Sequence, residues 1–289
     1  MNKKGWVAIE EFVLKHDYCT GCGVCSGVCP VDVLEMRFNA KGEYEPELIG
    51  KCIDCGLCSI GCPFVTENAT EDEMAEAYYG AVPEVQHHPD TGHYLASYVG
   101  HIRDDGHRWA GASGGMASWF MQTLLREGIV DHVICVAQHE DANKLYTFEV
   151  VSSHEDILRT ARSAYYPVEM SAVLDHVMKH KGRYALIGLP SFIKGVRLAS
   201  LKMPKLKSRI TLYAGITCGQ LVTKGFAESI TRSMYVDPAK LTAFNFRDKA
   251  PERPATNFNM TATTAEGSTS VQWQSFCELA WMSSMFKPN

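Results

Sequence analysis

Eight of the 11 cysteines in this 289-residue chain form two copies of one pattern, C-x2-C-x2-C-x3-C followed by proline. The first copy is Cys19, Cys22, Cys25 and Cys29, and the second is Cys52, Cys55, Cys58 and Cys62. Thiolates at this spacing bind iron–sulfur clusters. The chemistry expected of the chain is therefore electron transfer.

The spacing also predicts which thiols share a cluster. Three cysteines in one tight loop can occupy one face of a cubane cluster, while the fourth ligates the cluster of the other copy. One 4Fe-4S cluster is then expected at Cys19, Cys22, Cys25 and Cys62, and the second at Cys52, Cys55, Cys58 and Cys29. Glycines within the motifs suit loops whose backbone approaches inorganic sulfur closely.

Two other uses of cysteine fit less well. Disulfides need an oxidising compartment, and the first residues lack the apolar core and cleavage site of a secretory signal. Zinc would not explain why both copies end in Cys-Pro. Reduced thiols and oxygen-sensitive clusters instead predict a cytoplasmic protein of an anaerobic pathway. No apolar run of about 18 residues occurs, so no membrane span is expected.

Charge is unevenly distributed along the chain. Residues 1–80 contain 14 acidic and six basic residues, a net charge of -8, whereas the remainder has 19 acidic and 22 basic residues, a net charge of +3. The acidic balance argues against nucleic-acid binding. It is compatible with docking onto a basic face of a redox partner, and equally with ordinary surface solubility.

The elements that must hold these residues fall into two predicted domains. Residues 1–80 are expected to form an α+β ferredoxin-like domain with two 4Fe-4S clusters, ending in a polar stretch at 66–76 that is either a linker or a short exposed helix. Residues 81–289 are expected to form an α/β domain with a mixed sheet, because strand and helix patterns alternate there. Residues 80–92 indicate a loop.

The second domain has a regular sequence of expected elements. Strands are predicted at 95–102, 130–136, 145–151, 184–189 and 210–217. Helices are predicted at 116–127, 167–180, 190–201 and 224–235. A hairpin is predicted from 257–264 and 270–274.

One segment of this domain could hold a phosphate. Ala112-Ser113-Gly114-Gly115 lies at a predicted helix start, where consecutive backbone N–H groups and the positive helix end attract anions. The same residues would also serve as a plain helix cap. No G-x-G-x-x-G follows a strand and no G-x-x-x-x-G-K-[ST] occurs, so a standard dinucleotide or P-loop site is not expected.

Five segments in order resemble the beta subunit of coenzyme F420-reducing hydrogenase and its relatives. They are Ala112-Ser113-Gly114-Gly115 with 128–134, Ser163-Ala164-Tyr165-Tyr166-Pro167, Gly188-Leu189-Pro190-Ser191, Gly215-Ile216-Thr217-Cys218 and Phe246-Arg247-Asp248-Lys249. The resemblance implies an FAD-containing oxidoreductase that exchanges electrons between iron–sulfur clusters, the flavin and a small two-electron substrate such as coenzyme F420.

The resemblance also implies positions for the flavin. Ser113, Gly114 and Gly115 would hold the FAD phosphates, and Ser163 and Tyr165 would lie along the flavin. Gly188, Leu189 and Pro190 would approach the isoalloxazine ring, and Lys194 would place a positive charge near it. No side chain is identified as a catalytic acid, base or nucleophile, because the cofactors carry the chemistry.

The chain departs from the family pattern in two ways. Ser191 stands where relatives often have a cysteine that resembles a ligand of a further cluster, together with the one matching Cys218. The sequence also stops where relatives continue into a C-x-x-C segment, which predicts a domain truncated at its C-terminal end without a third cluster.

Two alternatives remain: an electron-transfer subunit that feeds a partner enzyme, and a degenerate member that acts as an interaction protein. The departures favour the second of these. The expected partner is a redox protein, whether a ferredoxin, a hydrogenase or another oxidoreductase subunit. Cys135 and Cys277 are expected to be buried core thiols.

Overall fold

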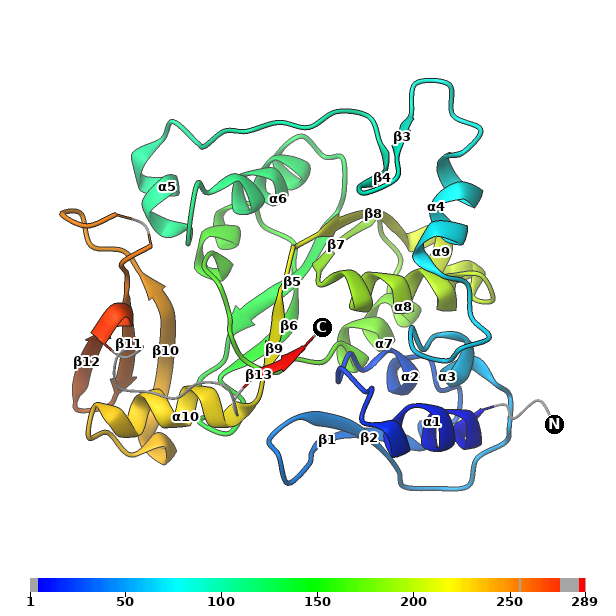
Figure 1. Ribbon diagram of the computed structural model, residues 1–289, viewed down its shortest axis with the longest axis horizontal. Helices are drawn as coiled ribbons and strands as arrows, with labels where there is room; N and C mark the ends of the chain where they lie inside the picture. Colours follow the sequence, from blue (N-terminus) through cyan, green and yellow to red (C-terminus); the bar gives the residue numbers. More distant parts are fainter. Residues whose placement is uncertain (1–4, 255, 276–285, 289) are drawn as a thin grey trace.

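The computed structural model describes residues 5–254, 256–275 and 286–288. A small N-terminal module lies beside a central α/β body, and a three-stranded sheet covered by one helix lies at the opposite end of the molecule (Figure 1). No helix within the described ranges is long and apolar enough to cross a bilayer. Cys277 lies outside the described residues.

The N-terminal module is built on the cysteine motifs. Its elements are α1 (Trp6–Phe12), the 3-10 helix η1 (Leu14–His16), α2 (Val24–Gly27), β1 (Leu34–Phe38), β2 (Tyr44–Leu48) and α3 (Leu57–Ile60). The antiparallel β1–β2 pair runs in register from Leu34 opposite Leu48 to Phe38 opposite Tyr44. Cysteines pack with Ile9, Val13 and Val65 in one core. The predicted ferredoxin-like module is confirmed.

The central body is a four-stranded mixed sheet in the order β6-β5-β7-β8. β5 (His132–Gln138), β7 (Tyr184–Gly188) and β8 (Ile210–Gly215) are parallel, and β6 (Tyr146–Val151) is antiparallel to β5. Around the sheet lie α5 (Asp105–Ala110), α6 (Met116–Arg126), η2 (Glu155–Thr160), α7 (Ser171–Lys179), α8 (Pro190–Ser200) and α9 (Pro204–Arg209). The predicted α/β body is confirmed.

Alternating side chains divide the sheet between two cores. In β7, Ala185 and Ile187 pack with Met121 and Leu124 of α6, whereas Leu186 packs with Leu174 of α7 on the other face. Successive side chains of a strand point to opposite faces, so a strand buried on both faces reads as a continuous apolar run. This is why the sequence places β7, which is buried at every residue, within one residue of its observed bounds.

A third core closes the far end of the molecule. It lies between α10 (Lys224–Ser233) and a sheet of β10 (Leu241–Asp248), β11 (Asn259–Thr264) and β12 (Gly267–Gln272), with the 3-10 helix η3 (Pro238–Lys240) between α10 and β10. A separate pair joins β9 (Gln220–Val222) to β13 (Phe286–Pro288). The β11–β12 hairpin confirms the prediction, whereas β10 has no counterpart among the predicted strands. The Gln138 amide donates to the Phe244 carbonyl at 2.8 Å and ties β5 to β10.

The module docks on the body through close backbone contacts. An added Cβ at Gly27 would lie 2.9 Å from Leu174 Cβ, and one at Gly195 would lie 3.0 Å from the Gly61 carbonyl. The Met170 N–H also donates to the Cys22 carbonyl at 3.1 Å. α2 and α3 therefore lie directly against α7 and α8.

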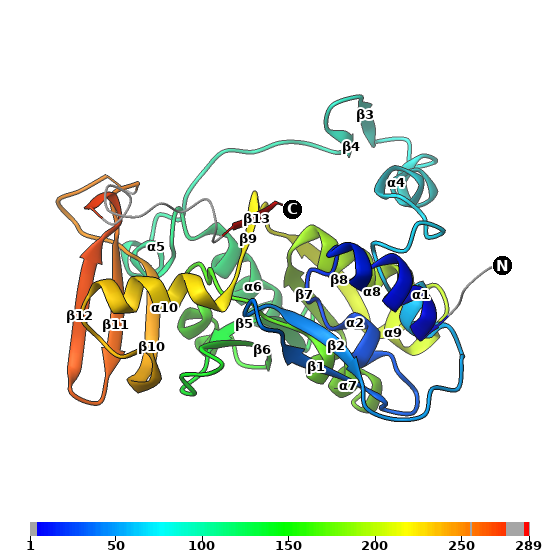
Figure 2. The same ribbon diagram turned by 60° about the horizontal axis from the view of Figure 1, so that its bottom comes forward.

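The connection between module and body follows one of the two predicted alternatives, a short helix, and adds a hairpin to the predicted loop. Residues 66–76 lead into a helix, α4 (Glu71–Tyr79), whose start is a capping box of Thr70 and Glu73. The predicted loop contains a short hairpin of β3 (Gln86–His88) and β4 (Gly92–Tyr94). α4 and this hairpin project from the body in Figure 2.

The predicted strand at 95–102 is wrong. Tyr98 and Val99 are almost fully exposed, and the segment contains neither helix nor strand on its way from β4 to α5 (Figure 2). Its apolar residues satisfy the strand pattern locally, but no neighbouring strand pairs with them.

Candidate functional site

The eight motif cysteines come together in two sets, each drawn from both repeats. Cys22 interacts electrostatically with Cys62 and Cys19. Cys25 interacts with Cys22, Cys19 and Cys62, and less strongly with Cys58 of the other set. Cys58 in turn interacts electrostatically with Cys55, Cys52 and Cys29. The sets are defined here as the inner thiols (Cys19, Cys22, Cys25, Cys62) and the outer thiols (Cys29, Cys52, Cys55, Cys58). Cys62 therefore groups with the first repeat and Cys29 with the second, and the ligation of one cluster by each set stays a prediction.

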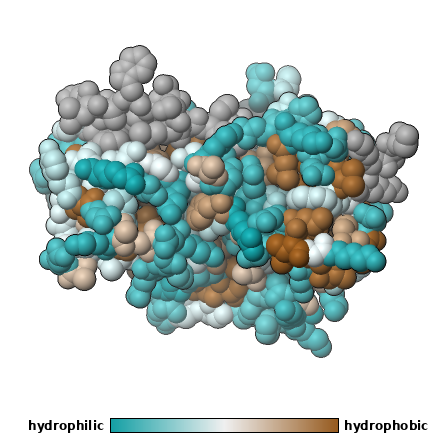
Figure 3. Space-filling model, turned by 90° about the horizontal axis from the view of Figure 1, so that it is seen from below, coloured by the Kyte–Doolittle hydropathy of each residue, from teal (hydrophilic) through white to brown (hydrophobic). Residues whose placement is uncertain are grey.

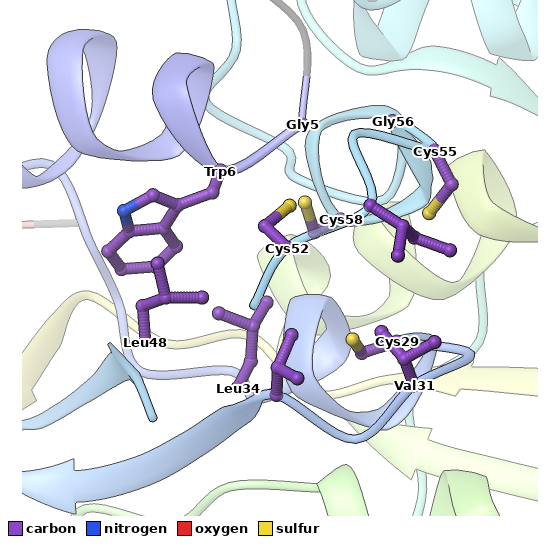
Figure 4. A pocket seen from close by; sticks show the side chains of 12 residues that line it. Gly5, Trp6, Cys29, Val31, Leu34, Leu48, Cys52, Cys55, Gly56 and Cys58 are labelled. Atoms are coloured by element: carbon purple, nitrogen blue, oxygen red, sulfur yellow. The ribbon is translucent and has the colours of Figure 1, made fainter. Parts of the chain in front are cut away.

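The outer thiols surround one cavity. Their four side chains line it together with Trp6 of α1, Leu34 of β1 and Leu48 of β2. In Figure 4 the labelled cysteines approach this space from the loop before α3, from α3 itself and from the loop after α2. Residues far apart in sequence thus converge on a space bounded by sulfur and apolar side chains.

Local backbone geometry positions the thiols in both repeats. Gly23 and Gly56, at φ 77° and 79°, are the left-handed N-caps of α2 and α3. Backbone N–H groups of Gly21 and Asp54 donate to the sulfurs of Cys19 and Cys52 at 3.4 and 3.3 Å. Such donors stabilise thiolates, which is the form that ligates metal. The geometry fits an iron–sulfur cluster.

Burial favours the neutral form of four of these thiols. It raises the pKa of Cys58 to about 12, and it raises the pKa values of Cys22, Cys25 and Cys62 as well. Ligating thiols must lose their protons, so iron binding at these residues is coupled to proton release.

A single metal ion fits the thiols less well than a cluster. Four sulfurs around one zinc ion would lie about 3.8 Å apart. Within the described ranges, the one group of three or more ligand atoms that all fall within 4.8 Å is Asp17, Glu43 and Glu45, and it contains no thiol. The cysteine sulfurs are therefore spread more widely than the ligands of one zinc ion.

Lys194 lies beside the inner thiols. Its ammonium counteracts the effect of burial on the pKa of Cys62 and pairs with Glu71 of α4 at 3.1 Å. Its side chain is only 12% exposed. The neighbour of this charge in the structure is therefore one of the inner thiols. Its expected proximity to a flavin stays a prediction.

A second region brings the Ser113 loop against β10. Lys249, which follows β10, donates from its ammonium to the Ser113 carbonyl at 2.7 Å and to the Arg108 carbonyl at 2.6 Å. The same ammonium lies 5.6 Å from the Trp109 ring centre. Gly114 and Gly115 lie at the start of α6, whose first turn has no side-chain cap.

The segment at 162–165 meets β10 next to this loop. Arg162 pairs with Asp248 at 2.7 Å, and the Tyr165 ring lies edge-on to Phe246 at 5.6 Å. Tyr165 is 37% exposed, and Ser163 is half-buried between these two contacts. β10 therefore joins the Ser113 and Tyr165 segments, which are 50 residues apart in sequence.

Positive charges crowd this region. Burial lowers the pKa of Lys249, and Arg108, Arg247 and Arg162 lower it further. A bound anion would relieve this repulsion, and the uncapped start of α6 adds donors. The residues present thus fit a diphosphate. The sequence alone assigned no role to Lys249, although this residue ends the F-R-x-K segment that resembles the family.

The Gly188 turn lies apart from these cations and leads toward the cysteines. Gly188 ends β7 at the carboxyl edge of the sheet, Leu189 caps α8, and Pro190 occupies its first turn. Ligands of open α/β sheets bind at this edge. Further along, Gly195 of α8 contacts the Gly61 backbone beside Cys62. One helix therefore connects this edge with the inner thiols.

Two similar proteins match more than half of this chain. The chain is 27% identical over 187 residues to a coenzyme F420-dependent sulfite reductase of Methanocaldococcus jannaschii, covering 64% of this chain and 26% of that protein. It is 24% identical over 217 residues to one of the F420H2 dehydrogenase subunits of Methanosarcina mazei, covering 71% and 54%. The chain thus spans about half or less of the length of these relatives.

A solved structure also matches part of the chain. It is the F420-reducing NiFe hydrogenase complex of Methanosarcina barkeri, at 16% identity and a TM-score of 0.47, covering 67% of this chain and 65% of that one.

Family models account for most of the sequence. A 4Fe-4S dicluster domain matches residues 11–63, which hold all eight motif cysteines. The N-terminal and C-terminal models of the coenzyme F420 hydrogenase/dehydrogenase beta subunit match residues 97–175 and 181–284. The chain therefore belongs to the coenzyme F420 hydrogenase/dehydrogenase beta subunit family and carries an N-terminal 4Fe-4S dicluster domain.

Proposed function

We propose that the protein is an iron–sulfur flavoprotein oxidoreductase that moves electrons between a two-electron substrate and a one-electron redox partner. It would hold two 4Fe-4S clusters and FAD, and it would act in the cytoplasm. The observation that carries the proposal is α8, which begins at the Gly188 turn and packs against the inner thiols. This helix connects the expected flavin edge to a cluster site.

The residues of the chain have separate roles in this proposal. The inner and outer thiols hold one cluster each. Lys249 and the start of α6 bind the FAD diphosphate, with Ser113, Gly114 and Gly115 as its backbone cradle. Ser163, Tyr165 and the turn at 188–190 border the ring system. Bound flavin supplies the exchange between hydride and single electrons.

Coenzyme F420 is the two-electron substrate that we propose. Both curated relatives carry F420 in their names, and the family is defined by F420 enzymes. The second candidate is an electron-transfer subunit without its own substrate. Partial coverage of the longer relatives favours it, because a shared module can serve a larger enzyme.

Anaerobic purification tests the proposal directly. Mass spectrometry of released cofactors is expected to find FAD, and the protein is expected to oxidise reduced F420 while reducing a viologen dye. Iron and sulfide without FAD, and without F420 oxidation, would contradict the flavoprotein and support the electron-transfer subunit. Bound FAD with no F420 oxidation would contradict the substrate alone.

Replacing Lys194 by methionine is expected to lower the reduction potential of the inner cluster. A positive charge favours the reduced, more negative cluster, although Glu71 offsets part of this effect. The loss is on the order of 1 kcal/mol at an effective dielectric of 20, or roughly 40 mV for one electron. Redox titration followed by electron paramagnetic resonance measures it, with Lys202→Met, a change at an exposed lysine beyond α8, as the control. An unchanged potential would contradict the placement of this charge.

A further inference from the structure

The internal repeat allows each cluster site to be compared with its counterpart. Aligning the motifs pairs Ile53 with Thr20, Cys55 with Cys22, and Val31 with Phe64. At the inner site Cys22 is 9% exposed, and Thr20 and Phe64 are half-buried. At the outer site Ile53 is 56% exposed, Val31 is 40% exposed and Cys55 is exposed. The two sites therefore differ in coverage at matched positions.

Packing against the body explains the covered site. The Met170 N–H donates to the Cys22 carbonyl, and Gly195 of α8 contacts the Gly61 backbone. Within the ranges that the structure describes, no comparable element lies over Val31, Ile53 and Cys55. We define these three residues with Ile49, which is 51% exposed, as the outer port.

The outer port has the composition of a contact surface. Val31 and Ile53 both line the cavity of the outer thiols and also reach the surface. Apolar side chains gather on the half of the molecule formed by the N-terminal module in Figure 3, which views it from below. Exposed apolar residues grouped around a functional site mark an interaction surface.

Charge indicates what kind of partner fits. Asp32 and Asp54 follow Val31 and Ile53 directly, and both are exposed. Lys51 precedes Asp54 by three residues, Arg37 follows Asp32 by five, and Lys179 of α7 lies close enough to Asp32 to interact with its charge. Residues 1–80 nevertheless carry a net charge of -8. An apolar centre with an acidic rim is complementary to an apolar centre with a basic rim.

We propose that the outer port docks a one-electron redox protein whose redox centre is ringed by lysine or arginine side chains. This inference rests on the clusters of the proposed function, but not on its flavin. The outer cluster would be the place where single electrons pass between proteins. In that step one electron leaves the reduced outer cluster and reduces the partner's centre, and no bond is formed or broken.

Cytochrome c, a small lysine-rich one-electron acceptor, is a suitable probe. A carbodiimide joins contacting carboxylates and lysines without a spacer, and mass spectrometry of the products is expected to identify Asp32 and Asp54. The pair D32N/D54N should remove these cross-links. Both residues have positive φ, at 50° and 53°, and asparagine tolerates that conformation. The matched control is D72N/E84Q, which removes two exposed charges from α4 and the following loop.

Electron transfer provides a second readout. Protein reduced with dithionite and then desalted is mixed with ferric cytochrome c at low ionic strength. The bimolecular rate should fall about tenfold in D32N/D54N and become less sensitive to salt, because steering depends on unscreened charge. Replacing Val31 and Ile53 by serine should also slow it, whereas serine at Ile129 and Leu201, which are 50% and 55% exposed, should not.

Two results would overturn the proposal. In the first, iron analysis shows that the port variants contain both clusters, and their cross-linking and electron transfer to cytochrome c equal those of the wild type. The other is a dimer in sedimentation that the port variants dissociate, since the port would then join two copies of this chain. Neither result depends on FAD, so they are distinguishable from failure of the flavoprotein proposal.

Discussion

Replacing Cys62 by alanine is expected to empty the cluster site of the first cysteine motif, although Cys62 belongs to the second. Cys62 lies with Cys19, Cys22 and Cys25 among the inner thiols, so its loss leaves three ligands there. The outer thiols remain complete. The protein should retain about half of its iron and sulfide, because each site is proposed to hold one 4Fe-4S cluster.

Cys29→Ala is the reciprocal change, and the retained cluster distinguishes the two variants. In Cys62→Ala the remaining cluster lies at the exposed outer site, and a chelator should remove its iron quickly. In Cys29→Ala it lies at the inner site, where Cys22 and Cys25 are less than 10% exposed, and removal should be slow. Cys135→Ala, which removes a buried thiol outside both sets, should leave iron content unchanged. Slow removal in Cys62→Ala would contradict the exchange of ligands between repeats.

The conformation of the two cysteine loops could be predicted because its determinants are local. Each motif fixes its own loop, with Gly23 and Gly56 in left-handed conformations that start α2 and α3. The central strands were predictable for a similar reason, since β7 is apolar throughout and buried on both faces. A strand or loop whose own residues satisfy its requirements leaves a clear pattern in the sequence.

What the sequence could not predict depends on contacts between distant segments. Residues 95–102 have the composition of a strand, but strand formation requires a neighbour, and Tyr98 is 91% exposed. The neighbour of Lys194 could not be predicted either, because its charge lies next to Cys62 only through the packing of α8 on α3. The proximity to a flavin that the family resemblance implies for Lys194 stays a prediction. The role of Lys249 depends on β10 meeting a loop more than 130 residues earlier in the chain.

Lys249→Met is expected to weaken FAD binding by about 10- to 100-fold. Losing a hydrogen bond from a charged group costs roughly 1.5–3 kcal/mol, which corresponds to that change in dissociation constant. The ammonium holds the Ser113 and Arg108 carbonyls next to the uncapped start of α6, where the diphosphate is proposed to bind. Quenching of flavin fluorescence during titration of flavin-free protein measures the affinity.

The matched control is Lys240→Met. Lys240 ends η3 directly before β10 and pairs with Glu266 at the surface. FAD affinity should be unchanged in this variant. Riboflavin, which lacks the diphosphate, should bind equally well to the wild type and to Lys249→Met. Equal losses of FAD and riboflavin affinity would mean that Lys249 only maintains the fold of the loop, and the diphosphate assignment would be wrong.

The pH dependence of binding separates charge from packing. The pKa of Lys249 is lowered in the free protein by burial and by Arg108, Arg247 and Arg162. A bound diphosphate would raise this pKa, because an opposite charge favours the ammonium. Binding then takes up a proton above the lowered pKa, so FAD affinity should fall as the pH rises through that value. Lys249→Met should lack this fall in affinity, whereas Lys240→Met should retain it. The same pH dependence in both variants would show that another group titrates on binding and would contradict a direct contact between Lys249 and the diphosphate.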